Sequence, residues 1–191
     1  MRVFNLLVSG QHDGSHEARR EIEERLAEVG ARIERLEPSE IEGIFLVTVI
    51  MVCESPRECW VEDIKKVVAH LRDMCRTEPE KFAHTVYWVP IEFWVPSSMP
   101  EMVAAVNELS DRIQEHENWK MQLHKRGGAE HTAELIKALT EPIEKGHVNL
   151  ENPEKIVVVE ILGDYAGFSV IAPSELLDVG SIKRSLMREA R

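Results

Sequence analysis

Cysteine is scarce in this sequence, and a long apolar run is absent. The 191 residues include 3 cysteines, Cys53, Cys59 and Cys75, without CxxC spacing, so the sequence indicates neither a disulfide framework nor a zinc site. No segment approaches the roughly 20 apolar residues that a membrane-spanning helix needs. The apolar run near the N-terminus is too short for a secretory signal. We therefore expect a cytoplasmic protein without a membrane span.

Positive charge is also in deficit. The chain carries 23 Lys and Arg side chains against 34 Asp and Glu, which gives a net charge of −11. Because nonspecific affinity for nucleic acid comes from neutralising phosphates, this balance argues against indiscriminate binding to polyanions. Any nucleic-acid contact is therefore expected to be a focused patch. One run departs from the acidic background: residues 120–131 read KMQLHKRGGAEH.

The first half of the sequence predicts an α+β domain. Apolar runs typical of strands alternate with two helical patterns in the order βαββαβ, the ferredoxin-like unit. Pro90 and Pro96 interrupt the last strand, so we expect it to lie at a sheet edge or to split, with a domain boundary after residue 96. This assigns residues 1–96 to an N-terminal ferredoxin-like domain. Its predicted elements are a strand at 2–9, a helix at 15–29 ended by Gly30, strands at 32–36 and 43–51, a helix at 56–75 and a strand at 83–95.

Residues 97–174 predict a second α+β domain. Two helical patterns again alternate with apolar strands, and Gly163 and Asp164 join the last two strands. The remaining residues, 175–191, form a tail that is predicted to be helical although it contains Gly180. The predicted elements of the second domain are a helix at 99–115, a strand at 119–125, a helix at 130–143 and strands at 155–162 and 166–172.

The segment VSGQHDGS at residues 8–15 has two interpretations. It follows a strand and opens a helix, where glycine-rich loops hold phosphate on free backbone N–H groups. It resembles the SGGxDS loop of ATP pyrophosphatases incompletely, because Gln11 stands at the second glycine and Gly14 is inserted after Asp13. We favour a turn in which Asp13 or Ser15 caps the first helix.

Two other groups have a functional and a structural interpretation. His12, His16 and Glu17 are metal-ligand types, but no third histidine or cysteine has an evident place beside them, so we expect no metal. The second group is aromatic and consists of Trp88, Phe93 and Trp94. Such rings could stack on nucleic-acid bases, although alternation along a strand favours packing in a core.

The basic run is the strongest candidate for a binding site. Alternation along a strand places Lys120, Gln122 and His124 on one face, opposite the apolar residues 119, 121 and 123. Lys125 and Arg126 then enter a turn at Gly127 and Gly128, where the missing side chains would let a phosphate backbone come close. His131 begins the next helix, whose N-terminus favours anions. A charged, solvated strand edge would have the same local pattern.

Residues 119–173 together resemble the THUMP domain of tRNA-modifying enzymes. The resemblance rests on a basic strand that runs into KRGG, the helix EHTAELIKALTEPI, and the turn VNLENP at 148–153 followed by VEI and a final hairpin strand. The family signature is a VDL.NP turn, so Asn149 replaces its aspartate, which we expect to alter a turn contact more than the fold. In this family a ferredoxin-like domain commonly precedes THUMP, as the first 96 residues predict here.

The resemblance implies a noncatalytic adaptor that grips the acceptor end of tRNA. The family's catalytic domain usually follows THUMP, whereas this sequence ends at Arg191, as in the archaeal relatives of the THUMP adaptor for tRNA cytidine acetylation. A separate acetyltransferase would then form N4-acetylcytidine and hold acetyl-CoA and ATP, while this chain would need no cofactor. The alternatives are an ATP-dependent tRNA-modifying enzyme that uses residues 9–15, and a protein-docking module that has lost RNA binding. The expected RNA-binding residues are Lys120, Gln122, His124, Lys125, Arg126, Gly127, Gly128, His131 and Lys137, with Lys183 and Arg184 as a candidate extension.

Overall fold

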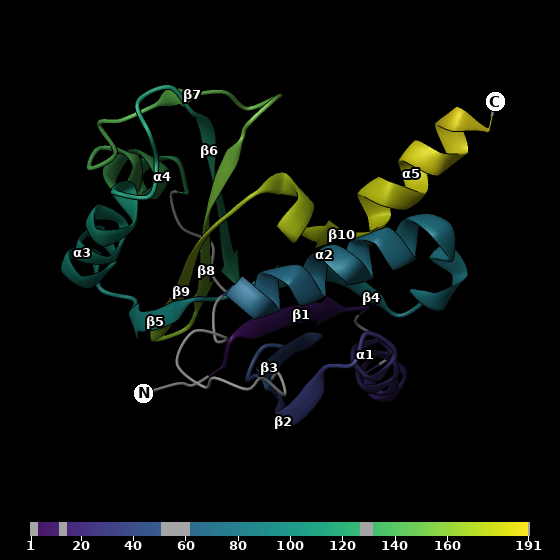
Figure 1. Cartoon of the computed structure of the whole chain (residues 1–191). Helices are drawn as coiled ribbons and strands as arrows, with labels where there is room; N and C mark the ends of the chain where they lie inside the picture. The colour runs from purple at the N-terminus through teal and green to yellow at the C-terminus, as the bar shows by residue number, and fades with distance from the viewer. Residues whose placement is uncertain (1–3, 12–14, 51–61, 127–131, 191) are drawn as a thin grey trace. The chain divides into compact units, whose positions relative to one another are not determined.

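The computed structural model describes residues 4–11, 15–50, 62–126 and 132–190 (Figure 1). The chain folds into two compact units. The first, which we call the N-terminal unit, is built from Phe4–Pro90 and Ser174–Arg191, and the second, the central unit, from Ile91–Pro173. Within the described ranges there are two five-stranded sheets and five α-helices, which confirms the expected α+β class. None of the described helices is long and apolar enough to cross a membrane.

The N-terminal unit contains one antiparallel sheet with three helices. Its strands lie in the order β10-β4-β1-β3-β2, and all neighbours are antiparallel. The first six strands and α-helices along the chain follow the expected order βαββαβ. The elements are β1 (Leu6–Gly10), α1 (Ser15–Glu28), β2 (Arg32–Pro38), β3 (Ile44–Ile50), α2 (Glu62–Thr77), β4 (Thr85–Pro90), β10 (Leu177–Asp178) and α5 (Val179–Glu189).

Helix α1 shows how local sequence sets an element and its end. Ala18, Ile22 and Leu26 recur every four residues and are fully buried against the sheet, as an amphipathic helix requires. After the helix, Gly30 takes a φ of 73°, a left-handed conformation that glycine adopts without steric cost. The Ala31 N–H donates to the Leu26 carbonyl at 2.9 Å, which satisfies one terminal acceptor. The predicted helix end at Gly30 is confirmed.

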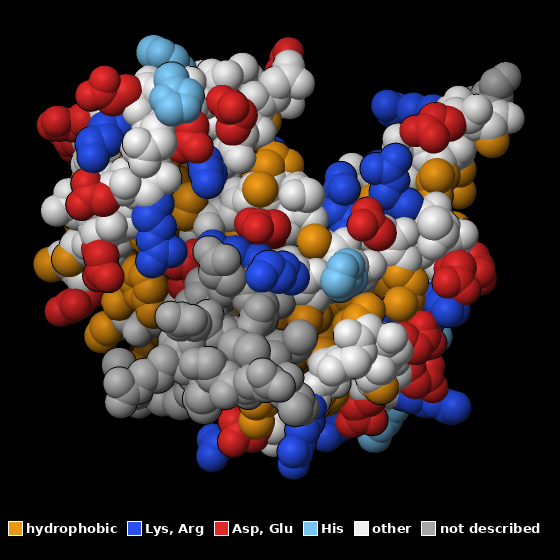
Figure 2. Space-filling view, viewed as in Figure 1, with side chains coloured by type: hydrophobic (Ala, Val, Ile, Leu, Met, Phe, Trp, Pro, Cys, Tyr) orange, Lys and Arg blue, Asp and Glu red, His pale blue; other side chains and the backbone are white. Residues whose placement is uncertain are grey.

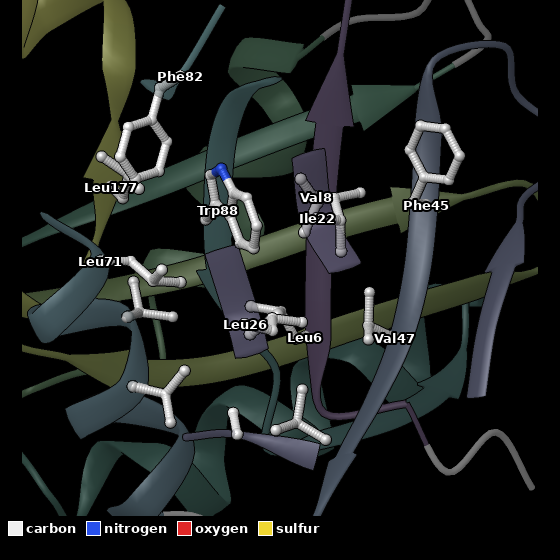
Figure 3. Close-up of a cluster of buried hydrophobic side chains, with 14 of the residues drawn as sticks. Leu6, Val8, Ile22, Leu26, Phe45, Val47, Leu71, Phe82, Trp88 and Leu177 are labelled. Carbon is white, nitrogen blue, oxygen red and sulfur yellow. The ribbon is translucent and has the colours of Figure 1, made fainter. Parts of the chain in front are cut away.

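The core of the N-terminal unit lies between its sheet and helices α1, α2 and α5 (Figure 3). Trp88 of β4 is fully buried there, with Phe82 edge-on to it at 6.4 Å between ring centroids. Its indole N–H donates to Thr85 Oγ1 at 2.9 Å, so the buried polar atom is satisfied. Trp88 is therefore a core residue, as strand alternation favours.

The central unit has a mixed sheet in the order β5-β9-β8-β6-β7. Strand β6 runs parallel to both of its neighbours, β8 and β7, whereas β8–β9 and β9–β5 are antiparallel. Helices α3 and α4 cover one face, as Figure 1 shows. The elements are β5 (Phe93–Pro96), α3 (Met99–Ser110), β6 (Asn118–Arg126), α4 (Thr132–Thr140), β7 (His147–Val148), β8 (Lys155–Leu162) and β9 (Tyr165–Ile171).

Aromatic packing fixes the edge of this sheet. Phe93 of β5 stacks on Phe168 of β9, with centroids 5.9 Å apart and planes at 16°. Trp94 lies over Gly167, where an added Cβ would come within 2.9 Å of the indole ring. Glycine at 167 thus leaves the space that the indole fills. Both aromatic residues are structural, in agreement with the interpretation favoured from the sequence.

The two units differ in extent from the domains expected from the sequence. The strand predicted at 83–95 splits, because β4 ends at Pro90 and β5 belongs to the other sheet. The division therefore falls at Pro90 and not at residue 96. Residues 174–191, expected as a separate tail, belong to the N-terminal unit: Leu177 and Asp178 pair with β4, and α5 follows.

Candidate nucleic-acid interface

Strand β6 contains most of the described residues of the predicted RNA site. It runs parallel to β8, with Lys120 beside Ile156 and His124 beside Glu160. Trp119, Met121 and Leu123 pack into the core under α3 and α4. The predicted alternation is confirmed, because residues 120, 122 and 124 must then project from the opposite face of the sheet.

The outer edge of β6 is largely uncovered by other strands. The two-residue strand β7 pairs only with Asn118 and Trp119. From Lys120 to Arg126, no strand of the described chain pairs with that edge. The side chains at 120–126 are all half-buried. The strand therefore has an edge that no described strand covers, beside its cationic side chains. We call this edge the rim of β6.

A buried carboxylate lies beneath the end of this rim. Glu160 of β8 has no exposed surface, and its Oε1 atom is 2.6 Å from Nδ1 of His124. Its second oxygen accepts from Nε of Arg126 at 3.3 Å. A buried carboxylate is stable only when it is paired and hydrogen-bonded, and the Arg126 charge fulfils that requirement. Part of the positive charge expected at the RNA site is therefore balanced inside the protein.

Lys125 lies on the opposite face from Arg126. Its neighbour on β8 is Ile161, whose side chain belongs to the core under the helices. Lys125 lines an open cavity of about 800 Å³ between β6, β8, α3 and α4. Met102, Leu135 and Ile161 give this cavity apolar walls, while Glu134 adds a carboxylate. An ammonium group beside an apolar hollow of this size suits a ligand that combines an anion with a flat ring.

Of the remaining predicted residues outside the candidate extension, the structure describes only Lys137. Gly127, Gly128 and His131 fall outside the described residues. Lys137 is exposed on α4, directly before Ala138, which lines the cavity. The structure thus places Lys125 at the cavity, whereas Lys120, Gln122, His124 and Arg126 share the other face of the sheet. Lys137 does not line the cavity.

The candidate extension belongs to the N-terminal unit. Lys183 of α5 donates from Nζ to the Phe82 carbonyl at 2.8 Å, so its ammonium group helps to hold α5 against its own unit. Arg184 is exposed.

The turn at 148–153 is held by the residue that departs from the family signature. The Asn149 side-chain oxygen accepts from the backbone N–H groups of Glu151 and Asn152 at 3.1 and 3.0 Å. Asparagine here closes the local turn that aspartate closes with the same acceptor geometry. The expectation that this substitution spares the fold agrees with these bonds.

In the described part of the glycine-containing loop after β1, two backbone N–H groups already bond within the chain. The Gly10 N–H donates to the Gly43 carbonyl at 2.7 Å, and the Gln11 N–H donates to the His84 carbonyl at 2.9 Å. Residues 12–14 lie outside the described ranges, while His16 and Glu17 are exposed on α1. In the described part of the chain, no three His, Cys, Asp or Glu residues form a group that could hold a metal ion.

Comparisons with known proteins identify the fold. Neither a protein-family model nor a curated protein sequence matches the chain. Similar solved structures include the following three. PH1313 from Pyrococcus horikoshii aligns over 88% of this chain with 13% identity and a TM-score of 0.52. TrmN from Thermus thermophilus aligns over 86% with 16% identity and a TM-score of 0.53.

Another similar structure is a possible methylase from Clostridium difficile 630, which aligns over 87% of this chain with 12% identity and a TM-score of 0.51. The alignments cover 55%, 44% and 40% of the three proteins in the order given, so this chain matches about half of each or less. At these identities the likeness concerns the fold, which the chain shares over most of its length.

Proposed function

We propose that this protein is an RNA-binding module that grips tRNA near its acceptor end. The main support comes from the end of β6. Lys125 lines a cavity with apolar walls there, and Arg126 projects from the other face of the sheet. A nucleotide combines a phosphate, which an ammonium or guanidinium group attracts, with a base that an apolar wall can pack against. The THUMP-like sequence of residues 119–173 and the fold shared with TrmN support this assignment.

The acidic remainder of the protein favours selectivity over affinity. Polyanionic RNA is repelled by most of a surface with a net charge of −11. A few cationic side chains at the end of β6 can still bind the phosphates at one end of the RNA and fix its position on the protein. Shape and unpaired terminal nucleotides would then supply the specificity, as is usual in RNA recognition.

The module presents tRNA to a separate modifying enzyme in this proposal. The resemblance to the cytidine-acetylation adaptor points to an acetyltransferase that forms N4-acetylcytidine and itself holds acetyl-CoA and ATP. Joining an RNA-binding module to an enzyme makes the second contact intramolecular and can raise the local concentration by about 10²–10⁴. The donors of Gly10 and Gln11 that already bond to the chain weigh against the ATP-dependent alternative.

Binding is tested by fluorescence anisotropy with labelled tRNA over a series of salt concentrations. About three to five phosphate contacts predict a log–log slope of roughly −3 to −5. Lys125→Ala should weaken binding and make the slope shallower by about 0.9. The matched control is Lys145→Ala, which removes an exposed lysine of the same unit that pairs with Asp111 at 3.0 Å. A slope near zero for the unaltered chain would favour the protein-docking alternative. If Lys125→Ala and Lys145→Ala weaken tRNA binding equally, Lys125 is not part of the binding site.

The adaptor role is tested by reconstitution. The purified chain with tRNA, acetyl-CoA and ATP should give no acetylcytidine. Addition of the acetyltransferase should give product faster than that enzyme alone, chiefly at low tRNA concentration, where the second contact matters most. Product from this chain alone would overturn the adaptor role. An acetyltransferase that works equally well without it would exclude this partner.

A further inference from the structure

Helices α2 and α5 of the N-terminal unit are neighbours (Figure 1). Residues of both helices line a groove that is open to solvent. The groove has a volume of about 190 Å³. Its floor is apolar, and its walls carry guanidinium and hydroxyl groups. The lining residues are Arg72 and Arg76 from α2, with Ser181, Ile182, Ser185, Leu186 and Glu189 from α5.

Helical periodicity aligns the polar groups along the two walls. Arg72 and Arg76 are one turn apart, beside the buried positions Leu71 and Cys75. Ser181 and Ser185 are likewise one turn apart on α5. The groove therefore has a row of two guanidinium groups facing a row of two hydroxyl groups across an apolar floor.

The arginines of this groove differ from those on α1. Arg19 and Arg20 each bond to a glutamate four residues later, at 3.2 and 2.9 Å. Within the described residues, neither Arg72 nor Arg76 has a carboxylate partner. Two like charges one turn apart repel each other, and an anion between them relieves that repulsion. The chain thus leaves an anion-attracting pair at the groove.

The surface beside the groove adds further positive charge. Figure 2 shows Lys and Arg side chains along α5. Arg184 and Arg188 of this helix are exposed. Arg188 follows Ser185 by three residues and therefore lies on the same side of the helix. Glu189 is the carboxylate that lines the groove, and it accepts from the Ser185 hydroxyl at 3.1 Å. Positive charge exceeds negative charge along this track.

We propose that the groove between α2 and α5 binds a backbone phosphate of RNA. Two guanidinium groups supply charge-assisted hydrogen bonds to phosphate oxygens. The Ser181 hydroxyl adds a neutral donor, and the Ser185 hydroxyl adds a second one when it rotates from Glu189 to the phosphate. The volume of the groove is sufficient for a phosphate group. This inference rests on the proposed tRNA binding and adds a second contact in the N-terminal unit, built from Arg72, Arg76, Ser181 and Ser185.

The test compares charge-matched variants in the salt-dependent tRNA assay. Arg72→Ala with Arg76→Ala should make the slope shallower by about 1.4–1.8, the loss of two phosphate contacts. The control, Arg19→Ala with Arg20→Ala, removes the same charge from the same unit and should leave the slope nearly unchanged. Ser181→Ala with Ser185→Ala retains every charge and should weaken binding by about 3- to 10-fold at an unchanged slope. Circular dichroism checks that each variant is folded.

The outcomes separate this inference from the proposed function. If both arginine pairs reduce the slope equally, the effect is one of net charge and the groove is not a site, while tRNA binding stands. If the arginine variant does not fold, the serine variant decides, and unchanged affinity overturns the inference. If the unaltered chain does not bind tRNA at about 50 mM salt, the proposed function and the groove are both wrong.

Discussion

Replacing Glu160 by glutamine should strengthen RNA binding. Glu160 is the buried carboxylate that contacts His124 and Arg126 under the strand end. Glu160→Gln removes its negative charge and keeps a side-chain oxygen that can still accept from Arg126. The side chain of Arg126 is 25% exposed. Without the neighbouring negative charge of Glu160, its guanidinium group would attract a phosphate more strongly.

The expected gain follows from Coulomb repulsion. A phosphate held by Arg126 would lie about 6 Å from the Glu160 carboxylate, given the extent of the guanidinium group between them. Their repulsion is about 0.7 kcal/mol at a dielectric constant of 80 and about 3 kcal/mol at 20. Screening at physiological salt roughly halves these values. Glu160→Gln should therefore tighten tRNA binding by about 2- to 10-fold.

The assay is tRNA binding at about 0.15 M salt, with urea unfolding run in parallel. Loss of the buried charge pair should lower the free energy of unfolding by about 1–3 kcal/mol. Asp111→Asn is the control, because it removes a charge of the same sign from an exposed ion pair of the same unit. Weaker or unchanged binding by a folded Glu160→Gln variant would show that Arg126 does not contact RNA.

Two further predictions concern buried groups of the N-terminal unit. Glu21 accepts from the backbone N–H groups of Ala83, His84 and Thr85 at 2.8–2.9 Å. Glu21→Gln places an amide donor against them and should lower the free energy of unfolding in urea by about 2–4 kcal/mol, while the exposed Glu23→Gln should cost under about 0.5 kcal/mol; equal losses would contradict this. Burial raises the pKa of the Cys75 thiol from 9.0 to about 11. Burial of the neutral Cys75 thiol therefore contributes to the free energy of unfolding below pH 9, and this contribution is lost as the pH rises toward 11. At about pH 8 iodoacetamide should alkylate Cys75 about 100-fold more slowly in the folded chain than in urea, and equal rates would show an accessible thiol.

The sequence predicts β6 well and its surroundings poorly. Alternation is a local property, and the apolar residues at 119, 121 and 123 were enough to orient the strand. If the same alternation is extended to Arg126, it places Lys125 and Arg126 on opposite faces of the sheet, which is what the structure shows. The pairing of Arg126 with Glu160 depends on the β6–β8 register between segments far apart in the chain, and no local pattern reveals that register.

The groove between α2 and α5 was harder to predict. The sequence indicates a helical tail, but nothing in it shows where the tail docks. The element that docks it, β10, has only two residues, so it has no detectable strand pattern. Leu177 and Asp178 take their place in the sheet because Leu177 is fully buried in the core of the N-terminal unit. Arg72 and Arg76 acquire their facing serines only through this long-range contact.

The pairing of β10 with β4 makes the central unit an insertion within the N-terminal unit. Trp88 pairs with Leu177, and the whole central unit separates these two residues in the sequence. Closing so long a loop of unfolded chain costs conformational entropy. The entry and exit strands of the central unit are neighbours, with Phe93 opposite Phe168. Once the central unit has folded, it brings the two crossover points together and shortens the loop that remains to be closed. Folding of the inserted unit thus prepares the last strand and α5 to complete the unit that began the chain, and a fragment ending at residue 97 would lack both.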